Sequence, residues 1–153
     1  MKVASIDVGS YSIRLSVAEV NTGLELIHEE GRITALATDL KDSGLLRQDR
    51  IEESLEVIRE FLQKAKELGA ERIKIVGTEA LRRAKNAGEF LERLKALTEL
   101  ELRVITPEEE GRYAFLSVAY SLRPSGRFCI IDQGGGSTAV SYTHLTLPTN
   151  REV

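Results

Sequence analysis

Apolar and polar positions alternate along the first third of the chain. Residues 2–6 are mostly apolar, residues 7–10 supply a turn, and apolar side chains then recur at every second position from 13 to 17. After a second turn, a further apolar segment extends over residues 24–33, with an interruption expected near Gly31. This pattern predicts three antiparallel strands.

The period changes from two to 3.6 in the next segment. Two glutamates open it and Gly69 follows it, which are start and stop signals of a helix. Apolar residues recur at spacings of three and four. They are Ile51, Leu55, Ile58, Leu62, Ala65 and Leu68. The spacing predicts a helix over residues 51–68.

The remaining elements alternate between strand and helix. Residues 72–78 and 100–105 are short apolar runs typical of buried strands. Between them, Asn86 and Glu89 have the spacing of a capping box and predict the start of a helix. Its apolar face comprises Phe90, Leu91, Leu94 and Leu97.

A further helix is predicted from stronger start signals. Thr106 suits the N-cap, Pro107 suits the first helical position, and Glu109 stands three residues after the threonine. This helix is expected to reach about Leu122.

A three-strand meander followed by alternating helices and strands predicts the α/β class, with a mixed sheet and helices on its faces. Residues 127–132 form another apolar run, and a glycine turn follows at 134–136. A new structural unit therefore begins near the end of the chain.

Composition narrows the class of protein. The 153 residues carry a formal net charge of -3, which suits one domain and does not favour non-specific binding to nucleic acid. No apolar segment approaches the roughly 20 residues that a membrane helix needs. Cys129 is the single cysteine and cannot form an internal disulfide, so we expect a cytoplasmic protein without a membrane partner.

One motif occurs twice. An apolar strand leads to Asp7, Gly9 and Ser10 near the start, and a similar strand leads to Asp132 and the run 134–137 near the end. Glycine turns expose backbone N–H groups to a phosphate, and an aspartate at a strand end can hold a divalent cation. Each motif alone also suits an ordinary hairpin turn. Two matching copies favour a phosphate clamp.

These motifs resemble the Ppx/GppA family of exopolyphosphatases and guanosine pentaphosphate phosphatases. The matching segments occur in the order and spacing of the family. They are Asp7–Ser10, Gly77–Arg82, Asn86 with Phe90 and Leu91, Glu109–Arg112, and Ile131–Thr138.

The resemblance implies an actin-like, ribonuclease-H-like fold of two related domains with the active site between them. Residues 1–124 would form the first domain, and residues 125–139 would open a truncated second domain. The implied substrates are polyphosphate or guanosine pentaphosphate, and the implied cofactor is Mg²⁺. A homodimer of the complete protein is compatible with the resemblance, which leaves the oligomeric state open.

The resemblance gives Glu110 the role of the general base that activates the attacking water. Helix geometry supports the choice of one glutamate, because neighbouring side chains on a helix point about 100° apart. Glu108, Glu109 and Glu110 therefore do not all face one cleft. Without the resemblance, the run would be interpreted as favourable charge at a helix N-terminus.

The resemblance also implies the ligands of the phosphoryl group and the metal. Asp132 would position Mg²⁺, with Asp7 as a further metal or water contact. A guanidinium binds phosphate oxygens with two parallel N–H donors, which suits the expected role of an arginine. The expected phosphate-binding residues are Gly9, Ser10, Arg82, Gly134, Gly135, Gly136 and Ser137.

Three positions depart from the family pattern. Tyr11 replaces the usual asparagine, and residues 35–38 replace an arginine- and glycine-rich segment. Ala139 stands where family members carry a glutamate thought to bind metal. If Ala139 is genuine, catalysis would be impaired.

The last residues look foreign to the family. Residues 140–153 resemble a translated sequencing adapter, and we interpret them as a non-native tail. A genuine strand ending is the alternative, because Val140 and Tyr142 are compatible with a strand. Neither His144 nor His28 receives a functional role.

The leading hypothesis is a Mg²⁺-assisted phosphohydrolase, of which this chain is a truncated and inactive form. A sugar or acetate kinase of the same superfamily is a second hypothesis, disfavoured by Arg82 and Glu110. A third is a non-catalytic sensor of polyphosphate or alarmone, which Ala139 would favour.

Overall fold

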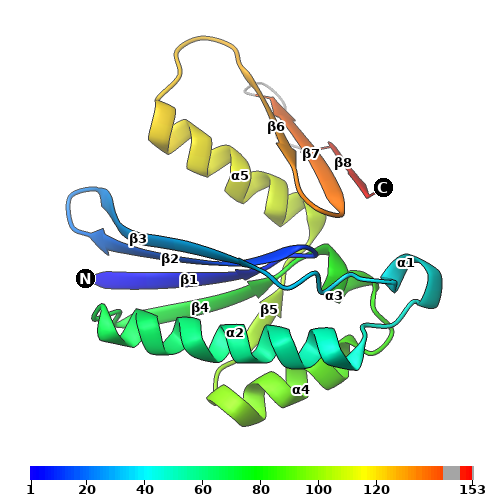
Figure 1. The fold of residues 1–153 in the computed structure, drawn as a ribbon. Coiled ribbons are helices and arrows are strands. Elements are labelled where there is room, and N and C mark those ends of the chain that lie inside the picture. Colours follow the sequence, from blue (N-terminus) through cyan, green and yellow to red (C-terminus); the bar gives the residue numbers. More distant parts are fainter. Residues whose placement is uncertain (143–148, 153) are drawn as a thin grey trace.

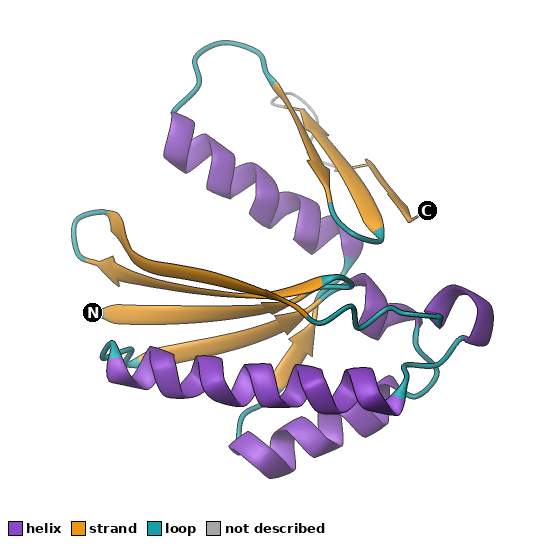
Figure 2. Ribbon diagram, in the orientation of Figure 1, coloured by secondary structure: helices purple, strands orange, loops and turns teal. Residues whose placement is uncertain are grey.

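The chain forms two sheets with helices between and around them (Figures 1 and 2). The computed structural model describes residues 1–142 and 149–152. The elements are β1 (Lys2–Val8), β2 (Ser12–Val20), β3 (Leu24–Ile33), α1 (Leu40–Ser43), α2 (Gln48–Glu67), β4 (Arg72–Gly77), α3 (Glu79–Arg83), α4 (Ala87–Thr98), β5 (Leu102–Val104), α5 (Pro107–Leu122), β6 (Cys129–Gln133), β7 (Ser137–Tyr142) and β8 (Thr149–Glu152).

The larger sheet has the strand order β3-β2-β1-β4-β5. The first three strands pair antiparallel, while β4 is parallel to β1 and β5 is parallel to β4. Helices α2 and α4 cover one face of this sheet, and α5 lies on the opposite side (Figure 1). The predicted α/β class and mixed sheet are confirmed. β6, β7 and β8 form a second, antiparallel sheet.

The core lies between the larger sheet and α2. Alternate residues of β1, including Ile6 and Val8, are fully buried on this side, as are Ile13 and Leu15 of β2. Side chains of a strand point to opposite faces in turn, so Asp7 stands on the other face, towards α5. The core thereby fixes the end of β1 while leaving Asp7 outside it.

The capping box predicted for α5 is present. The hydroxyl of Thr106 accepts a hydrogen bond from the backbone N–H of Glu109 at 3.2 Å, and the Glu109 carboxylate accepts one from the N–H of Thr106 at 3.0 Å. The helix ends at Leu122, as predicted. The ring of Phe115 in α5 stacks on the ring of Phe128, with the ring centroids 5.4 Å apart. This contact joins α5 to the segment that leads into β6.

The capping box predicted at Asn86 is wrong. The Asn86 side chain makes no cap hydrogen bond to α4. Instead its amide oxygen accepts from the N–H of Leu46 at 2.8 Å, and its amide nitrogen donates to the carbonyl of Leu46 at 3.0 Å. A tertiary contact uses both functions of the amide, so the residue joins α4 to the loop before α2.

Other local predictions also need correction. β3 is continuous through Gly31, and the irregular pairing lies between β2 residues 17 and 18. Helix α2 begins at Gln48, three residues earlier than expected. The short helices α1 and α3 were not predicted, because four or five residues are too few to show a helical period.

The proposed foreign tail was expected not to continue the second hairpin. In the structure, β7 extends through Tyr142, and β8 pairs with it. Strand pairing of residues with suitable propensity does not reveal where a sequence comes from, so the tail's non-native origin stays a prediction. Residues 143–148, with His144, lie outside the described residues.

The role of Asn86 can be tested by unfolding in urea. Asn86→Ala removes two hydrogen bonds to Leu46, so we expect a loss of about 1–2 kcal/mol of stability. Glu89→Ala, which removes the acceptor that a capping box would need, is the matched control and should change stability by less than about 0.5 kcal/mol. Equal losses of stability for both variants would support a capping box at Asn86 and contradict the tertiary contact.

Candidate active site

The candidate site lies where β1 and β4 end side by side. These strands run parallel, with Val8 opposite Gly77, so both leave the sheet at the same edge. The backbone N–H of Thr78 donates to the carbonyl of Val8 at 3.3 Å. The turn after β1 and the start of α3 are therefore neighbours. In parallel sheets this edge is the usual place for ligands.

The two glycine turns meet at this edge. The hairpin joining β6 and β7 reaches down to the turn between β1 and β2 (Figure 1). A Cβ atom placed on Gly135 would lie 2.7 Å from Cβ of Tyr11. One placed on Gly136 would lie 2.9 Å from Cδ of Glu79 and 3.1 Å from Oγ of Ser10. Only glycine permits this approach at both positions.

Three carboxylates converge on the site. Asp7 is accessible to solvent on one side and has protein on the others. Desolvation by that protein raises the pKa of Asp7 to about 6, with further upward contributions from the charges of Glu110 and Asp132. Arg14 acts in the opposite direction. Residues from β1, α5 and β6 are thus close enough to influence one another.

Glu110 is held by the arginine that was predicted to bind phosphate. Nη2 of Arg82 donates to Oε2 of Glu110 at 3.0 Å, and Nη1 donates to the carbonyl of Ile105 at 2.9 Å. The two side chains are only 14% and 21% exposed. A guanidinium has five N–H donors, so it can hold this carboxylate and a phosphate oxygen together.

The three consecutive glutamates of α5 point in different directions, as helix geometry predicts. Glu109 completes the capping box and also pairs with Arg103. Glu108 is exposed to solvent, whereas Glu110 bonds to Arg82 within the site. The orientation of Glu110 therefore fits the predicted base, and its catalytic role stays a prediction.

The predicted Mg²⁺ ligands fit a cation shared with substrate. Within residues 1–142 and 149–152, no group of three or more His, Cys, Asp or Glu side chains could hold a metal ion alone. Mg²⁺ is often bound by one or two carboxylates together with phosphate oxygens and water. Asp7 and Asp132, which lie near the ends of β1 and β6 just before the two turns, offer such an incomplete set.

Sequence reasoning missed Arg14 and Glu79. Arg14 pairs with Asp7 across the β1–β2 hairpin, and the hairpin register would have revealed that they are neighbours. Glu79 is 3% exposed and receives hydrogen bonds from Ser10 and Arg83. Its burial depends on α3, which is too short to show a helical period, although the residue lies within the Gly77–Arg82 segment that resembles the family. The predicted phosphate contact Ser10 thus has its hydroxyl engaged by Glu79.

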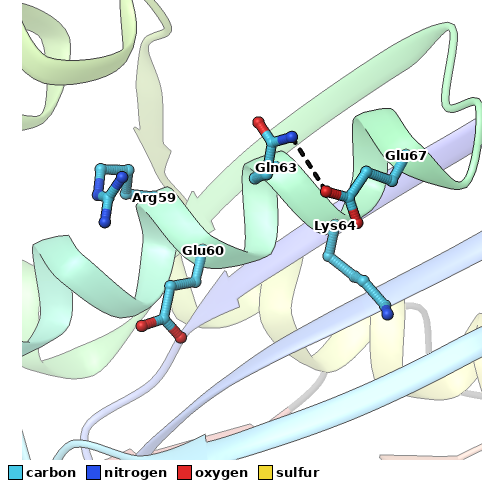
Figure 3. A pocket seen from close by; sticks show the side chains of 5 residues that line it. All are labelled: Arg59, Glu60, Gln63, Lys64 and Glu67. Atoms are coloured by element: carbon cyan, nitrogen blue, oxygen red, sulfur yellow. Dashed lines mark hydrogen bonds between the residues drawn. The ribbon is translucent and has the colours of Figure 1, made fainter.

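Two surface depressions occur in the described part of the chain, one beside the site and one away from it. One, of about 510 Å³, adjoins the first glycine turn and is lined by Tyr11, Arg14 and Arg32 among others. The other lies along α2 and is drawn in Figure 3. Its residues belong to one polar helix face, where Gln63 donates to Glu67 at 3.0 Å. Only the first depression is next to the candidate site.

Comparison with known proteins identifies the family. The sequence description of the Ppx/GppA phosphatase family matches residues 16–147. The chain belongs to the Ppx/GppA phosphatase family. It is 51% identical to a solved Aquifex aeolicus member of this family, with a TM-score of 0.87 over 99% of this chain and 51% of that one. An exopolyphosphatase from Cytophaga hutchinsonii, 19% identical, shares the fold with a TM-score of 0.93 over 100% of this chain and 51% of that one.

Curated relatives in the Ppx/GppA family are longer than this chain. A guanosine-5'-triphosphate,3'-diphosphate pyrophosphatase of Pseudoalteromonas atlantica is 32% identical over 90% of this chain, which spans 27% of that protein. A putative exopolyphosphatase of Haemophilus influenzae is 30% identical over 90% of this chain and 43% of its own length. The predicted family and actin-like fold are confirmed. The division at residues 124 and 139 stays a prediction.

The proximity of Glu110 to Asp7 can be tested by NMR titration. Glu110→Gln removes a negative charge near Asp7, so the pKa of Asp7 should fall from about 6 towards its ordinary value. Glu108→Gln, on the exposed neighbouring residue, should leave that pKa unchanged. The arrangement would be contradicted if both variants shifted the Asp7 titration equally.

The raised pKa of Asp7 also predicts how stability depends on pH. Because the folded-state pKa is raised, protonated Asp7 favours folding, and this contribution is lost as pH rises from about 4 to about 6. Asp7→Asn should therefore unfold at a higher temperature than the unsubstituted chain at pH 7 without metal. The difference should disappear below about pH 4. A difference of the same size at both pH values would contradict the shift.

Proposed function

We propose that the complete protein releases terminal phosphate from inorganic polyphosphate or guanosine pentaphosphate by attack of water. The observation that carries this proposal is the meeting of the two glycine turns beside Asp7 and Glu110. Family membership supports the reaction class, and the names of the relatives support both substrates. Such phosphoryl transfer depends mainly on positioning and electrostatic stabilisation.

Each proposed role follows from the chemistry of the residue. Glu110 would accept the proton of the attacking water, because a carboxylate can act as a general base and this one is partly exposed to solvent. Arg82 would bind an oxygen of the terminal phosphate. Backbone N–H groups of Gly9 and of residues 134–137 would surround the remaining oxygens.

Asp7 and Asp132 would hold Mg²⁺ against the substrate. The cation supplies positive charge that stabilises the phosphate oxygens as negative charge develops on them. Repulsion between Asp7 and its carboxylate neighbours supports a cation at this place, since a divalent ion would relieve it. These assignments rest on the arrangement of the carboxylates.

The proposed setting of the reaction is the cytoplasm. Cys129 is free and exposed, and the sequence contains no second cysteine with which it could pair. In the described part of the chain, no helix has the length and apolar character needed to cross a membrane. The first of these observations supports a reducing compartment.

The role of Glu110 can be tested in the complete protein by phosphate release. Glu110→Gln should lower kcat about 10²- to 10⁴-fold, because it removes a general base. Glu108→Gln should retain activity. A Glu110→Gln variant with unchanged kcat would contradict the base assignment. Substrate binding without any hydrolysis by the unsubstituted protein would instead favour the sensor hypothesis.

The 153-residue chain should be nearly inactive by itself. It spans about half of the solved relatives, so walls of the cleft that the rest of the protein supplies are absent from it. Phosphate release from tripolyphosphate should therefore stay at background under conditions where the complete protein turns over. Robust hydrolysis by the short chain would overturn this expectation.

A further inference from the structure

Glu79 is a buried carboxylate that the proposed chemistry does not use. It is the first residue of α3 and is 3% exposed. Burying a charge is costly unless partners compensate for it. Arg83, one turn later on α3, donates to Oε1 at 2.7 Å and supplies that compensation. The opposite oxygen, Oε2, faces the first glycine turn.

Ser10 donates its hydroxyl proton to this opposite oxygen. The distance from Oγ of Ser10 to Oε2 of Glu79 is 2.5 Å, and both residues are buried. A serine hydroxyl has one proton and two lone pairs, whereas an ionised carboxylate only accepts. The direction of this hydrogen bond is therefore fixed, and the hydroxyl cannot simultaneously donate to a phosphate oxygen.

The second glycine turn rests on the same pair. A side chain at Gly136 would collide with the Glu79 carboxylate and approach Oγ of Ser10. Glu79 consequently contacts both turns and also begins the helix that carries Arg82. No other described residue of the site is shown to contact both turns in this way.

We propose that Glu79 is a positioning residue: it accepts the hydrogen bond that the Ser10 hydroxyl donates, so that Ser10 presents oxygen lone pairs to water in the site. Ser10 then accepts a hydrogen bond from a water molecule instead of donating one to phosphate. The backbone N–H groups of the turn remain the phosphate donors. This inference rests on the proposed function only in that the water it orients is the one that attacks phosphorus.

The kinetic consequence of losing this hydrogen bond is a lower kcat with little change in KM. A hydrogen bond that orients the attacking water matters most in the transition state, whereas a phosphate contact also holds the bound substrate. Loss of the Glu79 acceptor should therefore slow turnover without weakening substrate binding. A role limited to folding would alter stability but not produce this division.

The experiment compares five variants of the complete protein by steady-state kinetics on tripolyphosphate. Ser10→Ala and Glu79→Ala should each lower kcat about 10- to 100-fold with KM nearly unchanged. The Ser10→Ala/Glu79→Ala double variant should be no slower than either single variant, because one residue acts through the other.

Glu79→Gln should restore most of the activity, since its amide oxygen still accepts from Ser10 and Arg83 can turn to solvent. Glu89→Gln, whose side chain bonds to Gln48 of α2 outside the candidate site, is the matched control and should match the unsubstituted protein.

Several results would overturn the proposal. One is a rise in KM without a fall in kcat, and a second is a double variant as slow as the product of both single effects. A third is Glu79→Gln as slow as Glu79→Ala, which would assign the effect to charge and not to the acceptor. Urea unfolding of the same proteins should show Ser10 and Glu79 coupled in stability, and independent effects there would also overturn it.

The stability measurement separates this proposal from the proposed function. If the unsubstituted complete protein hydrolyses neither tripolyphosphate nor guanosine pentaphosphate, the proposed function fails and with it the assignment of the attacking water. Coupling of Ser10 and Glu79 in unfolding would then still support the fixed direction of the hydroxyl, and its absence would contradict it.

Discussion

The desolvation of Asp7 beside two other carboxylates is the constraint on which this site depends. The surrounding protein desolvates Asp7, and the charges of Glu110 and Asp132, which come from two other elements, also act on it. Like charges this close cost free energy unless cations or protons compensate for them. The chain supplies Arg14 beside Asp7 and Arg82 beside Glu110. A phosphohydrolase would compensate for the remaining negative charge with a divalent cation. The electrostatic cost of the site and its proposed chemistry therefore have the same origin.

The fold meets this constraint through rigid elements and close backbone contacts. Parallel pairing of β1 and β4 places the first turn beside α3, and the buried side of β1 fixes Asp7. The capping box commits Glu109 to the helix end, whereas Glu110 bonds to Arg82 within the site. Gly135 and Gly136 let the second turn approach the first without a collision. Each part of the site is thus positioned by an ordinary structural device.

Sequence patterns predicted the elements that have a long period or a complete local signal. The alternation in β1 and β2, the apolar stripe of α2 and the capping box at Thr106 were all sufficient. The capping box predicted at Asn86 was wrong because the side-chain amide hydrogen-bonds to Leu46 instead. No local sequence pattern reveals such a tertiary contact. Glu79 was missed for a related reason, since its importance arises only when α3 brings it against Ser10 and Gly136.

The repeated aspartate and glycine motif predicted which residues would meet, but not their bonding. Ser10 was expected to bind phosphate, and in the structure its hydroxyl donates to Glu79. Arg82 was expected to face the substrate, and it also holds Glu110. Residue types at suitable spacing therefore indicated the chemistry, whereas the direction of each hydrogen bond depended on packing between distant segments.

In the proposed function, both glycine turns bind one phosphoryl group that also carries a bound cation. A crystal structure of the complete protein with Mg²⁺ and tripolyphosphate tests it most directly. We expect a Mg²⁺ ion bound by Asp7 or Asp132, directly or through water, with the terminal phosphate between the turns and facing Glu110. Phosphate bound away from both turns, with no cation at either aspartate, would contradict this arrangement.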